Sequence, residues 1–432
     1  MKKMKVISLL LVAILVVTSL VTLVACTDKD EDRIELLVWA PSAAQTFYKT
    51  WADKWAKDYK DSQGRQYKIK MGIKGEGDAK TDLLYAVQDG ADVFAFADDQ
   101  LGELVNAGAI SRVGDPSAEG TTAKDVATRN SAGSVQAATY KGANDEKEMI
   151  YAYPMQADNG YFLYYDANVL SEEDVSNWDK LWAKVEQINQ GAAQRKKVLW
   201  AFGTAWYQAA WFFSFGGTVS TTATNFHTDE VGLPALKAAY KFGNHQDLMS
   251  VDPNDGTEGI KDGDIVAAVA GGWIYDDVKG GDADIKLTVL PAIVDEDGVE
   301  HPMYSFLGSK LFGVNAQRDY QEASHSLANY LTSEEVQIAK AEALSAGPSN
   351  INAADSDVAK NLPTVQALAK QAEHSVPQIN LPAGFWDALP AAVDFVKADH
   401  DKVGDYFPGG VANDAQLRTL LQAMYDAMKL AA

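Results

Sequence analysis

The chain of 432 residues contains a single cysteine, Cys26, and many fewer basic than acidic residues. With one thiol, an intrachain disulfide and a cysteine-based metal site are both excluded. The 38 Lys and Arg residues against 60 Asp and Glu residues give a formal net charge of −22. Nucleic acids and anionic lipid surfaces both require basic residues, so neither is an expected partner. The composition favours a soluble body with a neutral or polar ligand.

Several motifs of enzymes and cofactor proteins are also missing. Gly72–Lys80 is glycine-rich, but it lacks the third glycine of a dinucleotide turn and the Lys-Ser/Thr end of a phosphate loop. The six histidines are scattered, and there is no Gly-x-Ser-x-Gly elbow. The Asp-rich segments Asp252–Asp264 and Asp276–Asp284 do not fit an EF-hand and are expected to be solvated loops, although the sequence leaves ion binding there open. We therefore predict no cofactor and no metal.

The N-terminus has the pattern of a secretory signal. Lys2, Lys3 and Lys5 precede an apolar run over Val6–Ala25. The run ends in Leu23-Val24-Ala25-Cys26, which resembles the lipobox of bacterial lipoproteins. The resemblance implies a signal peptide over residues 1–25, a lipidated Cys26 and a tether over residues 26–33. The alternative is an uncleaved helical anchor, because the apolar run is long enough to span a bilayer.

The first part of the mature chain alternates strands and helices in the order β-α-β-α-β, within a chain long enough for two domains. The predicted elements are Ile34–Ala40, Ala43–Lys60, Tyr67–Ile73, Asp78–Gln88 and Asp92–Ala97. Trp51 and Trp55 are interpreted as core residues of the first helix. Ligands of such open sheets bind beyond the carboxyl ends of the strands, which places Trp39, Phe96 and the Asp98-Asp99 pair at the expected mouth.

Ile150–Tyr165 is rich in strand-forming residues and is our candidate for a crossing between two lobes. Pro154 excludes a central position in a sheet for this strand. Asp297-Gly298 predicts a hairpin turn. Further strands are expected at Val198–Phe202, Leu287–Val294, Glu300–Phe306 and Lys310–Val314, and further helices at Gln100–Gly108, Asn177–Ile188, Trp206–Phe215, Leu233–Phe242, Gln321–Leu331, Ser333–Ala343, Leu381–Lys397 and Ala415–Leu430.

Ala268–Asp277 combines glycines with large aromatic residues. Val266–Val269 reads as a short buried strand, and Gly271-Gly272 after it would allow a ligand to come close. Trp273 and Tyr275 follow directly and would suit a flat, partly apolar ligand such as a sugar ring. The alternative is an aromatic pair packed in a domain core.

These segments resemble the extracellular solute-binding proteins of sugar ABC transporters, and among them the maltodextrin-binding group. The resemblance spans almost the whole mature chain. It rests on Asp89–Ile110, Ala152–Asp158, Trp206-Tyr207 before Gly216-Gly217, Ala270–Tyr275, Leu287–Pro291 and Gly384–Trp386. It implies that Phe96, Trp206, Trp273 and Trp386 stack on sugar faces, that Asp99 and Asp158 accept bonds from sugar hydroxyls, and that Tyr207 contributes to the site.

The chain departs from the maltodextrin-binding pattern in two places. Pro41–Ala44 replace the polar residues expected after the first strand, and Gln100 replaces an Arg beside Asp99. The departures imply fewer polar contacts from the first lobe. Trp39 and Tyr275 are interpreted as core or supporting residues.

The resemblance implies an α/β, two-lobe periplasmic-binding-protein-like fold (type II) with a cleft and hinge crossings. The N-lobe is predicted over 34–156 and 302–332, and the C-lobe over 157–301 and 333–432. The implied function is capture of malto-oligosaccharide at the outer face of the cell membrane by a lipid-anchored monomer, which delivers the sugar to an ABC permease. Another oligosaccharide, or a lipid-anchored glycoside hydrolase, is the alternative. The resemblance implies a binding protein that is not an enzyme. Counting carboxylates does not decide against a hydrolase, because a glycosidase pair is defined by its separation.

Overall fold

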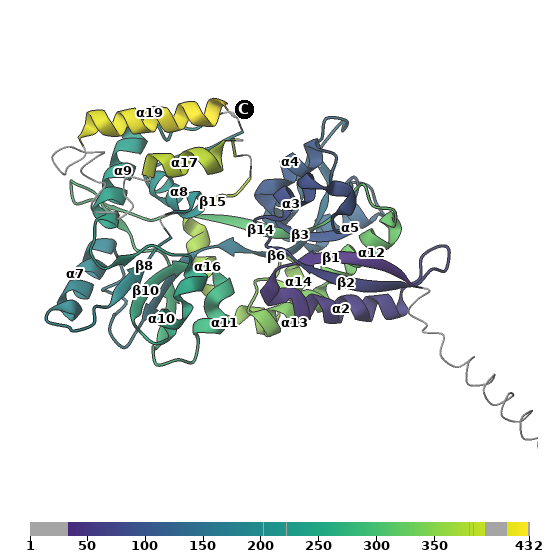
Figure 1. The fold of residues 1–432 in the computed structure, drawn as a ribbon, viewed down its shortest axis with the longest axis horizontal. Helices are drawn as coiled ribbons and strands as arrows, with labels where there is room; N and C mark the ends of the chain where they lie inside the picture. The colour runs from purple at the N-terminus through teal and green to yellow at the C-terminus, as the bar shows by residue number, and fades with distance from the viewer. Residues whose placement is uncertain are drawn as a thin grey trace, which may run out of the picture.

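The computed structural model describes residues 33–393, apart from 202, 222, 380 and 383, together with 413–430. These residues form two β-sheets, each flanked by helices, with long strands running between them (Figure 1). We call the two bodies the first lobe and the second lobe, and the two-lobe α/β architecture is confirmed. No helix in this part of the chain combines the length and apolar character needed to cross a membrane. The predicted signal peptide and Cys26 lie outside the described residues.

The sheet of the first lobe is built from the predicted alternating elements. Strand β1 (Ile34–Ala40) is parallel to both β2 (Tyr67–Ile73) and β3 (Val93–Ala97). The predicted bounds of β1 and β2 match the observed ones. All five residues of β3 are buried, because β3 lies between β1 and the antiparallel strand β14 (Ser305–Val314).

Helices cover the first sheet and bury its apolar faces. Their bounds are α2 (Gln45–Asp58), α3 (Ala79–Tyr85), α4 (Leu101–Asn106), α5 (Thr122–Arg129) and α6 (Ala132–Ala137), and a small pair of strands is formed by β4 (Thr139–Tyr140) and β5 (Met149–Ile150). Trp55 on α2 is 6% exposed, as a core residue should be. Trp51 is half-buried, with its ring centroid 6.2 Å from that of Phe47.

The second lobe contains a mixed sheet around a strand of small apolar residues. Strand β10 (Ile265–Ala270) is buried over its whole length, antiparallel to β7 (Phe162–Asp166) and parallel to β8 (Lys197–Leu199). Its burial on both faces explains the unbroken apolar sequence. The sheet is completed by β9 (Leu248–Met249) and β11 (Ile285–Thr288), and its helices include α7 (Trp178–Asn189), α8 (Ala205–Ser214), α9 (Asp229–Gly243), α10 (Thr257–Lys261) and α11 (Tyr275–Val278).

Two long strands pass between the lobes. Strand β6 (Ala152–Gly160) pairs with β14 and leads directly into β7 of the second lobe, so the predicted crossing is confirmed. Pro154 lies on β6, whose described partner is β14, and this agrees with its exclusion from a central position. The last residues of β14 pair with β3, whereas its first residues pair with β15 (Ser375–Pro377). Phe306 on β14 belongs to the core of the second lobe.

The predicted hairpin around Asp297-Gly298 is present but short. Its strands are β12 (Ile293–Val294) and β13 (Glu300–His301), which pair antiparallel. Gly298 has a φ of 80°, a left-handed conformation that glycine adopts without strain. The predicted strand Glu300–Phe306 is therefore divided between β13 and β14.

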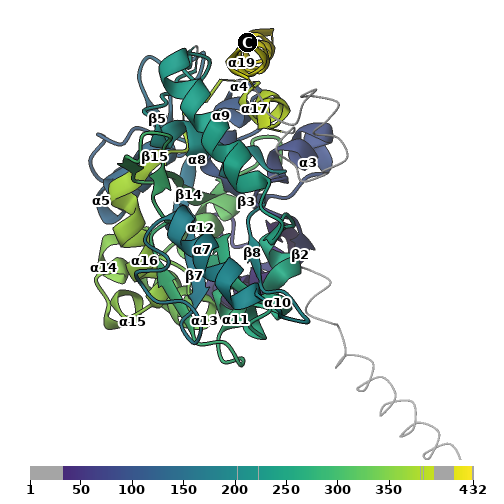
Figure 2. The ribbon, with the colours of Figure 1, turned by 90° about the vertical axis from the view of Figure 1, so that its left-hand side faces the viewer.

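The C-terminal part is helical, as predicted. Helices α17 (Phe385–Val393) and α19 (Asp414–Leu430) lie side by side against α8 and α9 of the second lobe (Figures 1 and 2). The predicted extension to Lys397 lies outside the described residues. The remaining bounds are α12 (Gln321–Leu331), α13 (Glu334–Leu344), α14 (Ile351–Ala354), α15 (Asp357–Lys360) and α16 (Pro363–Gln371).

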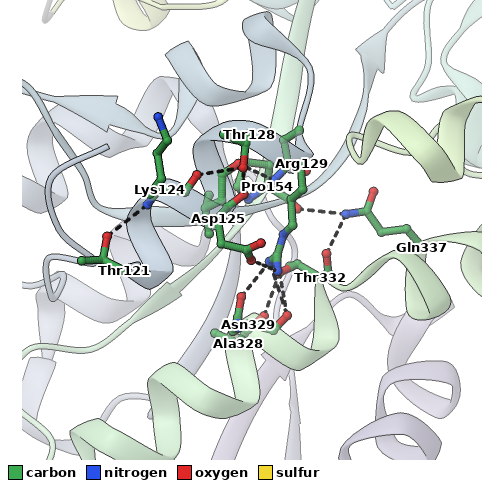
Figure 3. Close-up of polar contacts among 12 residues, drawn as sticks. Thr121, Lys124, Asp125, Thr128, Arg129, Pro154, Ala328, Asn329, Thr332 and Gln337 are labelled. Atoms are coloured by element: carbon green, nitrogen blue, oxygen red, sulfur yellow. Dashed lines mark hydrogen bonds and ion pairs between the residues drawn. The ribbon is translucent and has the colours of Figure 1, made fainter. Parts of the chain in front are cut away.

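The corner between α12 and α13 is held to the first lobe by side-chain hydrogen bonds (Figure 3). Arg129 forms an ion pair with Asp125 at 2.8 Å and donates to Asn329 Oδ1 at 2.7 Å. Gln337 on α13 donates to the carbonyl of Pro154 at 3.2 Å. The predicted lobe boundaries stay a proposal, and these contacts favour moving α13 from the second lobe to the first.

Candidate functional site

Two of the predicted stacking residues lie together on the second lobe. Trp206 is in the first turn of α8, and Trp273 follows the end of β10. Their ring centroids are 5.8 Å apart, with the planes inclined by 43°. Both side chains are half-buried. The two inclined indoles therefore form one aromatic surface, which we call the aromatic surface.

Gly271 allows the Trp273 indole to pack against the backbone. A Cβ on Gly271 would lie 1.8 Å from a ring carbon of Trp273, so the indole occupies the space that the missing side chain leaves. The carbonyl of Gly271 accepts a hydrogen bond from the Tyr164 hydroxyl at 2.8 Å. The prediction that Gly271-Gly272 allows a ligand to come close is therefore wrong at Gly271, because the Trp273 indole fills that space, and it stays a prediction at Gly272.

Asp99 faces this aromatic surface from the first lobe. It lies in the turn after β3, and its Oδ1 accepts a hydrogen bond from Gln378 Nε2 at 3.0 Å. Gln378 Oε1 in turn accepts from Trp206 Nε1 at 2.7 Å. Burial raises the pKa of Asp99 to about 6, although the hydrogen bond from Gln378 and the charge of Lys80 act in the opposite direction. The side-chain amide of Gln378 thus connects Asp99 of the first lobe to Trp206 of the second, and both are predicted site residues.

Asp158 lies on the crossing strand β6, and its two carboxylate oxygens already have protein partners. Oδ1 accepts from Gln156 Nε2 at 2.6 Å, and Oδ2 accepts from the backbone N–H of Gly347. Lys340 donates to Gln156 Oε1 behind this pair, and burial lowers the pKa of Lys340 to about 8. A carboxylate has further lone pairs, so Asp158 retains capacity for a ligand hydroxyl.

Lys310 and Glu76 are polar residues near the aromatic surface that sequence reasoning missed. Lys310 Nζ lies 5.6 Å from the ring centroid of Trp273 and 3.7 Å from Glu76 Oε2. Their side chains are only 14% and 13% exposed, so the ion pair is largely shielded from water. A signal was present for Lys310, because it is the single charged residue of β14. A charged residue in an otherwise uncharged strand indicates that its side chain points away from the core.

Two predicted site residues are buried in the lobe cores instead. Phe96 is 0% exposed, and its ring packs against Phe94 with centroids 5.4 Å apart. Tyr207 is 4% exposed and contacts Tyr161, with ring centroids 4.9 Å apart. Successive helix residues point about 100° apart, so Trp206 can face the lobe boundary while Tyr207 faces the core. The prediction that Phe96 stacks on a sugar is wrong for this conformation, and Tyr207 acts as a supporting residue.

Trp386 lies on α17 and is half-buried. Its described ring contacts are with Phe306 at 5.8 Å and Phe385 at 5.0 Å, both of which belong to the core of the second lobe. These contacts do not connect Trp386 to the Trp206–Trp273 pair. Its predicted role in sugar stacking stays a prediction.

The two departures from the maltodextrin-binding pattern have structural roles here. Gln100 is 2% exposed, accepts from the backbone N–H of Lys80 at 2.8 Å and donates to the carbonyl of Glu76 at 2.7 Å. Ser42–Ala44 form a single 3-10 turn that leads into α2. Gln100 therefore stabilises the loop that carries Glu76.

In the part of the chain that the structure describes, no group of three or more His, Cys, Asp or Glu side chains is arranged to hold a metal ion.

Comparisons with known proteins agree with this architecture. The family model of the bacterial extracellular solute-binding proteins matches residues 54–367. A solved structure described as a complex with acarbose has a TM-score of 0.77 and 27% sequence identity, covering 92% of this chain and 100% of its own. A maltodextrin-binding protein from L. casei BL23, solved without ligand, has a TM-score of 0.71 and 22% identity, covering 92% of this chain and 99% of its own.

A maltotriose-binding protein of Thermus thermophilus, bound with maltotriose, has a TM-score of 0.72 and 18% identity over 92% of this chain and 99% of its own. No curated protein sequence matches this chain. The family model covers well over half of the 432 residues. The predicted resemblance is therefore confirmed: this chain belongs to the bacterial extracellular solute-binding proteins, which bind their solutes and are not enzymes.

Proposed function

We propose that this protein binds malto-oligosaccharide between its two lobes and delivers it to an ABC import permease. One observation carries the proposal: the indoles of Trp206 and Trp273 stand side by side opposite the carboxylate of Asp99. The C–H-rich faces of a glucose ring match aromatic planes, and its hydroxyl edges require directed acceptors. Together these groups suit a short glucan.

The solved structures support this choice of ligand. Their descriptions name acarbose, maltotetraose and maltotriose as bound ligands. Two stacked rings and a few charged acceptors suffice for roughly micromolar affinity, about 8 kcal/mol. Another oligosaccharide is the second candidate, because the first lobe departs from the maltodextrin pattern at Pro41–Ala44 and Gln100.

Titration calorimetry tests the ligand. We expect heat of binding from maltose, maltotriose and longer maltodextrins, and much weaker binding of a β-linked glucose trimer of the same composition. Absence of heat from every maltodextrin would remove the proposed ligand, and preferential binding of the β-linked trimer would support the second candidate. We expect no release of reducing sugar over hours, because no bond is broken.

We further propose that the protein is anchored to the outer face of the cell membrane through a lipid on Cys26. The lipobox-like sequence Leu23–Cys26 supports this, and a tether over residues 26–33 would separate the lobes from the bilayer. Closure of the lobes around the sugar would present a state that the permease recognises. A Cys26→Ala variant should lose metabolic labelling by palmitate, while its binding of maltotriose stays unchanged. Retention of the label would contradict the lipid anchor.

A further inference from the structure

Gln378 joins the two lobes at the candidate site by hydrogen bonds. It directly follows β15 and is 4% exposed. Its partners come from three separate segments of the chain: the first turn of α8, the crossing strand β6 and the turn after β3. A single side chain therefore forms hydrogen bonds with both lobes and with a strand that runs between them.

The hydrogen bonds of Gln378 use both ends of its carboxamide. Oε1 accepts from Trp206 Nε1 at 2.7 Å and from Asn159 Nδ2 at 3.2 Å. Nε2 donates to Asp99 Oδ1 at 3.0 Å. An indole N–H can only donate and an ionised carboxylate can only accept, so the group between them must do both. A carboxamide meets this requirement without a charge.

The bond to Trp206 is made at the edge of the indole. Tyr161 contacts the same ring with centroids 4.6 Å apart at 68°, which is an edge-to-face arrangement. The hydrogen bond at Nε1 lies near the plane of the indole, so it constrains the orientation of the ring without covering its faces. Trp273 is a neighbour of this ring, with centroids 5.8 Å apart. The amide therefore sets the plane on which a sugar would stack.

We propose that Gln378 is a positioning residue that stabilises the closed arrangement of the lobes and orients Trp206 for the ligand. When the lobes separate, the bond between Gln378 and Asp99 breaks, and the amide and carboxylate must both be solvated. When the lobes close, the same amide joins the acidic side of the site to its aromatic side. The orientation of Trp206 for a sugar rests on the proposed function, whereas the effect on closure does not.

Small-angle X-ray scattering of the purified protein without sugar tests the closure. Gln378→Met keeps the length of the side chain but removes all three hydrogen bonds, and we expect a larger radius of gyration than in the wild type. Gln371→Met is the matched control, because Gln371 is 0% exposed and its amide bonds Leu290, Met303 and His374 within one region of the second lobe. It should lower stability without opening the lobes. Equal radii for the wild type and Gln378→Met, or the same increase in both variants, would overturn the proposal.

A second variant gives a signature that a general loss of stability does not produce. In Gln378→Glu the new carboxyl group faces Asp99, whose pKa also responds to Lys80 and Glu103, and Asp98 is the next acidic neighbour. Two carboxylates in contact must share a proton. We expect this variant to be compact at pH 5 and expanded at pH 8, while the wild type changes much less. A radius of gyration for Gln378→Glu that does not depend on pH would contradict the role of the Asp99 contact.

Calorimetry then tests the orientation of Trp206. Gln378→Met should bind maltotriose at least tenfold more weakly, and Gln371→Met should bind it as the wild type does. Unchanged affinity in Gln378→Met would remove the positioning role. If the wild type itself does not bind maltotriose, the proposed ligand fails, while the scattering experiments still decide whether Gln378 holds the lobes closed.

Discussion

The two lobes contribute different chemistry to the candidate site. The first lobe supplies charged groups, among them Asp99, Glu76 and Lys310. The second lobe supplies the indoles of Trp206 and Trp273. A sugar needs both kinds of surface, so neither lobe alone would hold it well. The separation implies that ligand affinity and lobe closure depend on each other.

Aromatic residues have different roles in the two lobes because they occupy different positions in the strands and helices. Phe96 is inside a strand that has a neighbour on each side and helices over its faces, so its ring is part of the first core. Trp273 stands just beyond the end of β10, where the sheet no longer covers it. Aromatic residues in strand interiors thus build the lobes, and those beyond strand ends or in a first helical turn are available for a ligand.

The largest effect on stability is expected from Phe96→Ala. Truncation of a buried aromatic ring removes apolar contacts and leaves a cavity, which costs about 3–5 kcal/mol of unfolding free energy. Denaturant unfolding followed by circular dichroism measures it. Phe96→Leu retains most of the volume and should bind maltotriose with wild-type affinity. Loss of affinity in a folded Phe96→Leu protein would return Phe96 to the binding site.

Trp273→Ala should weaken maltotriose binding at least tenfold, about 1.4 kcal/mol, because one of the two aromatic planes is lost. The half-buried side chain makes a smaller contribution to stability than Phe96, so the variant should remain folded. Trp51→Ala is the matched control, since Trp51 is also half-buried but packs against Phe47 and Tyr330 in the first lobe. Calorimetry compares the three proteins. Equal affinity in all of them would assign Trp273 to the core.

A smaller, pH-dependent effect is expected at Asp99. Its pKa is raised from 3.8 to about 6 in the folded protein. The stability associated with its protonated form is therefore complete below about pH 4 and is lost as the pH rises through 6. Asp99→Asn removes this loss, so the variant should be more stable than the wild type at pH 8, by roughly 1 kcal/mol after screening by solvent.

Denaturant unfolding of both proteins at pH 4 and pH 8 measures this difference. Most of the gain of Asp99→Asn should disappear at pH 4, where the wild-type carboxyl group is protonated in the folded state and close to half protonated in the unfolded state. A variant that is less stable than the wild type at pH 8 would show that the hydrogen bond from Gln378 to the carboxylate outweighs the cost of burying its charge.

The sequence predicts the elements of the fold better than the directions of their side chains. The alternation of β2, the apolar run of β1 and the small apolar residues of β10 identify strands because burial in a sheet imposes those patterns. The resemblance also identifies Trp206 and Trp273, which the structure brings together. It groups them with Phe96 and Tyr207, because a motif does not tell which face of an element is covered.

Gln378 has no signal in the sequence. It follows Pro377 in an irregular segment, and its partners Asp99 and Trp206 are far away along the chain. Gly271 shows the opposite case, in which the sequence signal was present but the structure gave it another meaning, since the Trp273 indole fills the space. Contacts between distant segments decide the role of Gln378, whereas the local turn between Gly271 and Trp273 decides that of Gly271.

A crystal structure of the protein with maltotriose tests the central claim most directly. We predict density for glucose rings against the indole faces of Trp206 and Trp273, with hydroxyl groups within hydrogen-bond distance of first-lobe residues such as Asp99. Density for the sugar at a different place, or stacking on other aromatic residues with this pair uncontacted, would contradict the division of the site into a charged first lobe and an aromatic second lobe.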